Sequence, residues 1–298
     1  MNPFNELHPR IVAGSRANVL AGLAVNALVD EAMLTPKPGL VDLRGSGAHR
    51  DLSWLLMCQS AHALRPAFAA MAGAGATMDD LPALRRRIGA IGRMAEATMM
   101  TATGGVNTHR GAIWALGLLV TAAAQGAGSA AIIAARAGAL ARLADPEAPA
   151  STGNKGEAAR RTYCVGGARG QAEAGFPHVV DVALPMLLAC RARGDGESAA
   201  RLNSLLAIVA ELDDTCLLAR GGTAALAAAQ AGAQAVLDAG GVSGATGPAA
   251  FQALEADMLA RGTSPGGAAD LLAAALLLDS LGNQPIDAME APHGATAV

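Results

Sequence analysis

The chain has 298 residues, of which 52% are apolar and only 2% aromatic, and its formal net charge is −3. A large core must therefore be built from small aliphatic side chains, and the scarcity of aromatic and β-branched runs argues against a sheet. The weak negative charge, without any basic block, argues against nonspecific binding to nucleic acid.

Apolar residues recur at helical spacing along most of the chain, and Gly, Pro and polar residues separate these runs. In chain order, the pattern predicts helices over residues 15–33, 52–71, 79–100, 109–124, 129–143, 178–193, 198–212, 222–237, 248–261 and 267–278. No repeat of fixed period and no long linker divides them. We therefore predict a single all-α domain over residues 1–298, with residues 1–12 and 282–298 as loose tails.

The cysteines and the ends of the chain indicate the compartment. The four cysteines lie far apart without a C-x-x-C pair, which favours reduced thiols over a zinc site or a disulfide framework. No charge occurs between Arg110 and Arg136, so this window is long enough for a membrane span, but the turn-forming segment Gln125–Ser129 favours two buried helices. The polar start of the chain does not resemble a signal peptide, and we expect a cytoplasmic protein.

The segment Thr103–Gly111 joins glycines to a polar stretch just before an apolar helix. Asn107 or Thr108 is expected to cap that helix, whose first turn carries His109 and Arg110. Exposed N–H groups, the positive end of the helix dipole and two basic side chains favour an anion site. The alternative is a tight loop between helices with an exposed His-Arg pair.

Lysine is rare in this chain. Lys37 and Lys155 are its only lysines, and both lie within segments rich in Gly, Pro and polar residues. A compact charge on a flexible stem suits a phosphate, although chance also places lysines in loops. No P-loop, Rossmann fingerprint, H-E-x-x-H or G-x-S-x-G motif is present.

Short motifs that pair acidic with basic residues beside glycine are spread along the chain. The acidic set is Asp42, Asp51, Glu157, Glu173, Asp213, Asp214 and Asp270, and the basic set is Lys37, His49, Arg50, His109, Arg110, Lys155, Arg169 and Arg220. A polyphosphate handled with Mg²⁺ requires such a mixture, since carboxylates hold the ion and Lys and Arg contact phosphate oxygens. Surface salt bridges are the alternative explanation.

Five of the motifs together resemble one known family. They are residues 34–42 (LTPKPGLVD), 47–49 (GAH), 103–111 (TGGVNTHRG), 169–177 (RGQAEAGFP) and 264–272 (SPGGAADLL). In this order they are similar to the triphosphoribosyl-dephospho-CoA synthases. The resemblance implies an all-helical transferase that joins ATP to 3′-dephospho-CoA, releases adenine, and makes the precursor of a prosthetic group.

The resemblance also implies tasks for particular residues. Attack of a 2′-hydroxyl on the ribose C1′ of ATP passes through an oxocarbenium-like transition state, so the site needs a base, a proton donor and a triphosphate anchor. The catalytic candidates are Asp42, His49 and Glu173, with His49 as proton donor. The phosphate-binding candidates are Lys37, His109, Arg110, Lys155, Arg169 and Arg220, and the candidates for Mg²⁺ are Asp213 and Asp214. For Asp213 and Asp214, a plain helix cap is the alternative. The family often has Glu where Gln171 stands, so the acidic role of that motif rests on Glu173.

Other functions stay open on the residues alone. A helical Mg²⁺-dependent hydrolase of ADP-ribosyl or nucleotide bonds would use similar carboxylates. A helical scaffold that binds an acyl carrier partner would need none of the Gly/Pro motifs to be polar. The resemblance implies that the product becomes the prosthetic group carried by the acyl carrier subunit of citrate lyase or malonate decarboxylase. The absence of the extra domain of fused citrate lyase proteins favours malonate decarboxylase. The apolar helical surface makes a homodimer plausible.

Overall fold

Alanine- and leucine-rich runs form helices throughout residues 16–283, the part of the chain that the computed structural model describes. No strand occurs within this range, so the predicted all-α class is confirmed. The helices are α1 Arg16–Met33, α2 Trp54–Ala63, α3 Arg65–Thr77, α4 Leu81–Ala102, α5 Arg110–Ala124, α6 Ala130–Arg142, α7 Lys155–Tyr163, α8 Gly167–Glu173, the π-helix η1 His178–Ala183, α9 Leu184–Ala192, α10 Glu197–Glu211, α11 Thr215–Asp238, α12 Gly247–Arg261 and α13 Gly266–Gly282. The predicted tails lie outside the described residues, except for Gly282, which ends α13, and Asn283, which caps it.

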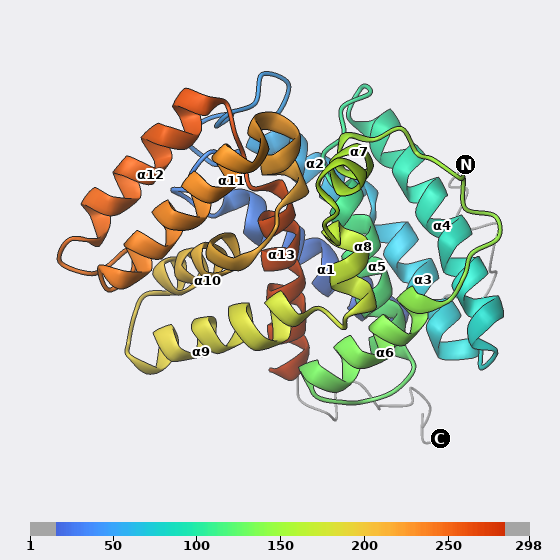
Figure 1. Ribbon diagram of the computed structural model, residues 1–298. Helices are drawn as coiled ribbons and strands as arrows, with labels where there is room; N and C mark the ends of the chain where they lie inside the picture. The colour runs from blue at the N-terminus through green and yellow to red at the C-terminus, as the bar shows by residue number, and fades with distance from the viewer. Residues whose placement is uncertain (1–15, 284–298) are drawn as a thin grey trace.

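Helix α13 forms the centre of the core. Every residue from Leu271 to Leu278 is buried, and the helix packs against α1 and α5 on one side and α10 and α11 on the other. Figure 1 shows α13 running through the middle, with α9 to α12 on one side and α3, α4 and α6 on the other. The small side chains of this core allow helices to approach closely. One core therefore holds all the helices together.

Three predicted helices differ from the structure. The helix expected over residues 52–71 is wrong, because the chain breaks at Leu64 between α2 and α3, where Pro66 has no N–H to continue the ladder. The run over 178–193 is divided into η1 and α9. Helix α11 begins earlier than predicted, and Gly222 inside it adopts φ 65° and ψ −163°, which kinks the helix. Helix α7 was not predicted, since its residues are mostly polar.

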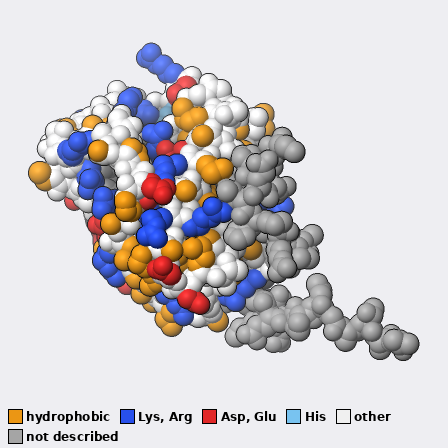
Figure 2. Space-filling model, turned by 90° about the vertical axis from the view of Figure 1, so that its right-hand side faces the viewer, with side chains coloured by type: hydrophobic (Ala, Val, Ile, Leu, Met, Phe, Trp, Pro, Cys, Tyr) orange, Lys and Arg blue, Asp and Glu red, His pale blue; other side chains and the backbone are white. Residues whose placement is uncertain are grey.

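Ion pairs fix the long connector between α6 and α7 to α4. Arg93 donates to Asp145 at 2.8 Å and to Glu147 at 3.1 Å, and Arg85 lies 3.5 Å from Asp145. On the side of the molecule that carries α4, basic, acidic and apolar side chains are interspersed (Figure 2). These ion pairs hold the connector against the surface of α4.

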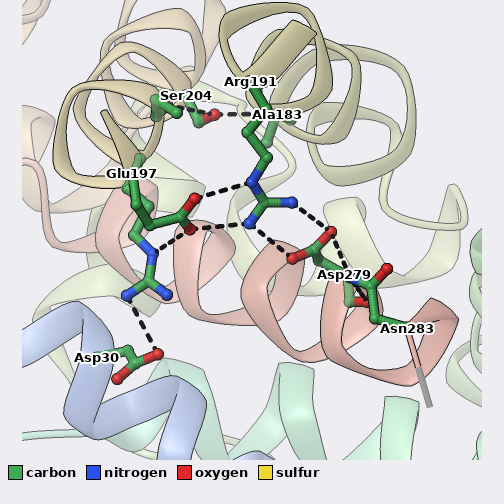
Figure 3. A network of polar contacts seen from close by, with 9 residues as sticks. Asp30, Ala183, Arg191, Glu197, Ser204, Asp279 and Asn283 are labelled. Carbon is green, nitrogen blue, oxygen red and sulfur yellow. Dashed lines mark hydrogen bonds and ion pairs between the residues drawn. The ribbon is translucent and has the colours of Figure 1, made fainter. Parts of the chain in front are cut away.

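A second network holds the other side of the molecule to the core. Arg191 donates to Glu197 at 2.8 Å and to Asp279 at 2.8 Å, and Arg201 links Glu197 to Asp30 (Figure 3). These pairs join α9 and α10 to α13 and α1. The network therefore anchors the far end of α13 while its first turn stays available for other contacts.

Among residues 16–283, no single helix is both long and apolar enough to cross a membrane, and only the pair formed by α8 and residues 178–192, bent by 81°, meets the criteria of length and composition.

Candidate active site

The connector after α1 buries an ion pair. Lys37 is only 2% exposed, and its Nζ donates to Glu31 Oε1 at 2.5 Å and to the Glu31 carbonyl at 2.6 Å. The prolines on both sides of Lys37 end the helix and turn the lysine back onto the last turn of α1. The amine of Lys37, a phosphate-binding candidate, therefore faces Glu31 inside the protein.

Asp42 is held by several donors. Its carboxylate accepts hydrogen bonds from the backbone N–H groups of Lys37 and Arg44, from the Arg44 guanidinium at 2.7 Å, and from the Thr35 hydroxyl. Burial alone would raise the pKa of Asp42, but these hydrogen bonds hold it below its usual value. A carboxylate with a low pKa and so many donors orders the connector and is a weak base.

His49 lies against Arg220. The Arg220 Nη2 is 3.0 Å from His49 Nδ1, and the same guanidinium donates to the carbonyls of Ala48 and Gly262 at 3.3 Å. Burial and the Arg220 charge lower the pKa of His49 to about 4. Because a guanidinium can only donate, Nδ1 accepts and the hydrogen of the neutral ring lies on Nε2. His49 is therefore neutral at pH 7, and Arg220 joins the loop at Ala48 to the segment before α13.

The helix α5 begins where the Thr103–Gly111 motif predicts, but its start differs from an open anion site. His109 occupies the cap position and is 2% exposed, and Asn107 Oδ1 accepts from the Arg110 N–H at 3.2 Å. Of the two predicted caps, Asn107 therefore makes the bond. Arg110 pairs with Glu96 at 3.0 Å.

His109 is neutral and incompletely bonded. Its Nδ1 lies 3.0 Å from Ser60 Oγ, which in turn lies 2.6 Å from Thr108 Oγ1. Burial and the nearby Lys37 charge lower the pKa of His109 to about 3. Its Nε2 is buried without a hydrogen-bond partner. His109 therefore supplies no positive charge to a phosphate at neutral pH, but it offers a polar atom to a ligand.

Asp214 joins two helix starts. It caps α11 by accepting from the Cys216 N–H at 2.7 Å, and it also accepts from the Ala268 N–H of α13 at 2.9 Å. Burial raises the pKa of Asp214 in spite of these and further backbone donors. Asp213 beside it is exposed. Across residues 16–283, no group of three His, Cys, Asp or Glu side chains is arranged to hold a metal ion.

Asp270, in the first turn of α13, completes the site and was not among the predicted site residues. Its carboxylate accepts from the Ala112 N–H at the start of α5, and a Cβ at Gly111 would lie 2.0 Å from Asp270 Oδ2. Burial and the neighbouring carboxylates of Glu31 and Asp214 raise the pKa of Asp270 well above its usual range. The motif at residues 264–272 contained it, but only the fold brings it to Gly111.

We use the name charge cluster for five ionisable side chains that are linked by an ion pair or by the effect of one charge on the pKa of another. They are Glu31, Lys37, His109, Asp214 and Asp270. They come from the end of α1, the connector after it, and the starts of α5, α11 and α13, helices that Figure 1 shows side by side around α13. The cluster carries more carboxylates than cations, so it suits a positively charged species better than a phosphate.

The remaining candidates lie outside the cluster. Arg169 donates to Glu173, four residues further along the exposed face of α8, at 2.6 Å, and the Glu173 carbonyl accepts from Arg142. Lys155 is exposed at the first position of α7, which packs against α11. Among the candidates, Lys155 and Arg220 are thus basic groups on the helices next to the cluster.

Buried, incompletely paired ionisable groups at converging helix starts are typical of an enzyme active site. The comparisons with known proteins define the enzyme as a transferase. A model of the family described as ATP:dephospho-CoA triphosphoribosyl transferase matches residues 17–287, and the chain belongs to this family.

Curated relatives agree with this assignment. A probable 2-(5''-triphosphoribosyl)-3'-dephosphocoenzyme-A synthase of Stutzerimonas stutzeri is 57% identical over 271 residues, which cover 90% of this chain and 93% of the relative. The 2-(5''-triphosphoribosyl)-3'-dephosphocoenzyme-A synthase of Klebsiella pneumoniae is 54% identical over 281 residues, or 94% of this chain and 99% of the relative. No solved structure matches the chain.

Proposed function

We propose that this enzyme joins ATP to 3′-dephospho-CoA with release of adenine, giving 2′-(5″-triphosphoribosyl)-3′-dephospho-CoA. One observation supports this most strongly: close approaches connect the motifs at residues 34–42 and 47–49 to each other and to Thr263, just before the motif at 264–272, and connect that motif in turn to the motif at 103–111. The Ala48 N–H donates to the Gly39 carbonyl at 3.0 Å, a Cβ at Gly39 would lie 2.5 Å from the Thr263 carbonyl, and Gly111 abuts Asp270. Segments more than 200 residues apart in the sequence thus lie close together, which supports a shared site.

The charge balance of the site fits this reaction. The ribose C1′ gains positive charge as adenine leaves, and the carboxylates of Glu31, Asp214 and Asp270 favour such a charge. The triphosphate, which is negative, would be repelled by them. We assign its anchoring to exposed basic residues beside the cluster, Lys155 and Arg220, because a flexible lysine and an arginine fork both suit phosphate oxygens.

Mg²⁺ belongs to the proposal as part of the substrate. Asp214 directs its oxygens to backbone N–H groups, and no third ligand stands near Asp213 and Asp214 within residues 16–283, so these residues do not fit a protein-held ion. Mg²⁺ commonly binds through substrate phosphates and few carboxylates. We therefore propose that the ion enters bound to ATP, where it neutralises phosphate charge.

Three finer expectations complete the proposal. The product is destined for the acyl carrier subunit of malonate decarboxylase, with that of citrate lyase as the alternative. The enzyme acts in the cytoplasm, where ATP is available, and it forms a homodimer. Loading of each purified carrier subunit by a coupled assay, cell fractionation and light scattering test these expectations in turn.

Adenine release tests the function directly. The purified chain is incubated with Mg²⁺ and with ATP alone, dephospho-CoA alone, or both, and adenine is measured by chromatography. The synthase releases adenine only with both substrates, together with a product whose mass equals that of the two substrates minus adenine. Adenine or ADP-ribosyl products from a single substrate would instead identify a hydrolase, and no reaction would refute the proposal.

A further inference from the structure

Asp270 lacks the ion pair that most buried carboxylates of residues 16–283 have. The other exception, Asp214, directs its oxygens to backbone N–H groups at two helix starts. Glu31 pairs with Lys37, Asp42 with Arg44, and Asp145 with Arg93. No ion pair joins Asp270 to a cation in this range, and its hydrogen bond comes from the backbone N–H of Ala112. A carboxylate held at low dielectric without a cation is costly, so proteins keep such groups mainly where they serve chemistry.

The surroundings of Asp270 leave it accessible to a ligand. The side chain is partly exposed, whereas the capping carboxylate Asp214 is 1% exposed. Gly111 has no side chain, and Asp270 Oδ2 occupies the space that a Cβ there would need. Position 111 therefore has to stay glycine for the carboxylate to reach the start of α5 in this orientation.

Two further polar atoms near the same helix starts lack partners. His109 Nε2, just before the first turn of α5, and Ser264 Oγ, just before α13, are both buried without a hydrogen bond, and their residues are 2% and 1% exposed. Buried polar atoms are normally satisfied, so unpaired ones at a site indicate a polar ligand that supplies the missing bonds. A sugar with several hydroxyl groups has that chemistry.

We propose that Asp270 is the catalytic carboxylate that contacts the ribose of ATP and accepts the proton of the attacking 2′-hydroxyl; this inference rests on the proposed function. The hydroxyl oxygen forms a bond to C1′ while the C1′–N9 bond breaks and its electron pair leaves with adenine. The proton lost by the hydroxyl passes first to Asp270. Asp270 then releases a proton to solvent while the departing adenine takes one up, so the net change moves one proton from the hydroxyl to adenine and needs no further reactant.

The electrostatics of the site support this role. The charges of Glu31 at the end of α1 and Asp214 at the start of α11 act on Asp270, and Asp270 acts on the Cys216 thiol. In the same cluster Lys37 pairs with Glu31, and its charge acts on His109. Burial and the two carboxylates raise the pKa of Asp270. A base whose pKa lies nearer to neutral pH is more effective than an ordinary carboxylate. The same negative surroundings stabilise a cationic ribose.

The decisive experiment compares two identical substitutions in the same helix. Asp270→Asn should lower kcat for adenine release by about 100-fold or more, in the range expected for loss of a general base, while KM for ATP changes by less than about 3-fold. Asp279→Asn, at the other end of α13 in the ion pair with Arg191, should keep kcat and lower the melting temperature. Asp270→Asn should not lower the melting temperature, because it removes an unpaired charge.

Two further readouts separate chemistry from structure. In the wild type, kcat/KM should fall on acidification at a pH above that of an ordinary carboxylate, and this acidic limb should be absent from the residual activity of Asp270→Asn. Gly111→Ala, which displaces Asp270 Oδ2, should also lower kcat. A kcat of Asp270→Asn within about 3-fold of the wild type, or an unchanged acidic limb, overturns the inference alone. Absence of adenine release by the wild type overturns the proposed function and this inference with it.

Discussion

Replacing Lys37 by Met should destabilise the protein strongly, because it leaves the Glu31 carboxylate buried without its cation. Lys37 and Glu31 are 2% and 5% exposed at their side chains and lie 2.5 Å apart. Removing one partner of a buried pair costs about 3–5 kcal/mol. At about 2–4 °C per kcal/mol for a domain of this size, we expect the melting temperature to fall by about 6–20 °C.

Lys155 provides the matched control, since it is the only other lysine and is exposed. Lys155→Met should leave the melting temperature unchanged and raise KM for ATP. The double variant Glu31→Gln with Lys37→Met should recover much of the stability lost by either single change, because no buried charge is left unpaired. Thermal unfolding followed by circular dichroism measures all of these effects.

Two different results would refute the reasoning. If Lys37→Met melted within about 2 °C of the wild type and raised KM for ATP, Lys37 would act as a phosphate ligand and the buried pair would contribute little. A melting temperature lowered equally in Lys155→Met would show that the loss does not depend on burial. The first outcome would move the triphosphate site to the connector after α1.

Three further predictions concern other parts of the molecule. Arg191→Met breaks the partly exposed ion pairs that Arg191 makes in Figure 3 and should lower the free energy of unfolding, measured in urea, by about 1–2 kcal/mol. In 1 M salt the difference between the variant and the wild type should shrink, and a difference insensitive to salt would contradict the prediction. Burial lowers the pKa of His109 to about 3, so as pH drops below 6.5 the unfolded chain takes up a proton before the folded protein does, and the free energy of unfolding falls. Relative to His109→Gln, the wild type should lose about 2 kcal/mol of this free energy between pH 7 and 5. Parallel curves of unfolding free energy against pH for the two proteins would exclude this. Chelating Mg²⁺ should abolish adenine release without changing the melting temperature of the free enzyme, whereas a shift in that temperature would indicate a protein-held ion.

Helical periodicity was enough to predict the fold class, because apolar residues at every third or fourth position share one face only in a helix, and such faces are buried by packing helix against helix. It could not locate the break at Leu64, since the residues on both sides of it continue the apolar pattern. It also missed α7, whose nine residues have a single buried member, Ala159. Helix ends and polar helices depend on contacts made elsewhere in the fold.

The site was predicted at the level of motifs more than of individual roles. The rarity of lysine drew attention to Lys37 and Lys155, yet one is buried against Glu31 and the other is exposed. His109 was expected to be a cationic ligand, but its charge depends on burial, which sequence spacing does not report. The carboxylate of Asp270 lies against Gly111, a residue distant in the sequence, so only the fold could show that Asp270 belongs to the site.

Helix α13 is the last of the described helices to leave the ribosome, although it supplies the centre of the core. The earlier helices that pack on it, α1 and α5, must therefore keep an apolar face uncovered while the intervening residues are translated. Contacts between α1 and α13 join segments of very high sequence separation, which slows their formation. A nascent chain stopped before residue 266 would thus present an uncovered apolar surface to chaperones, and it would lack the proposed catalytic carboxylate, Asp270.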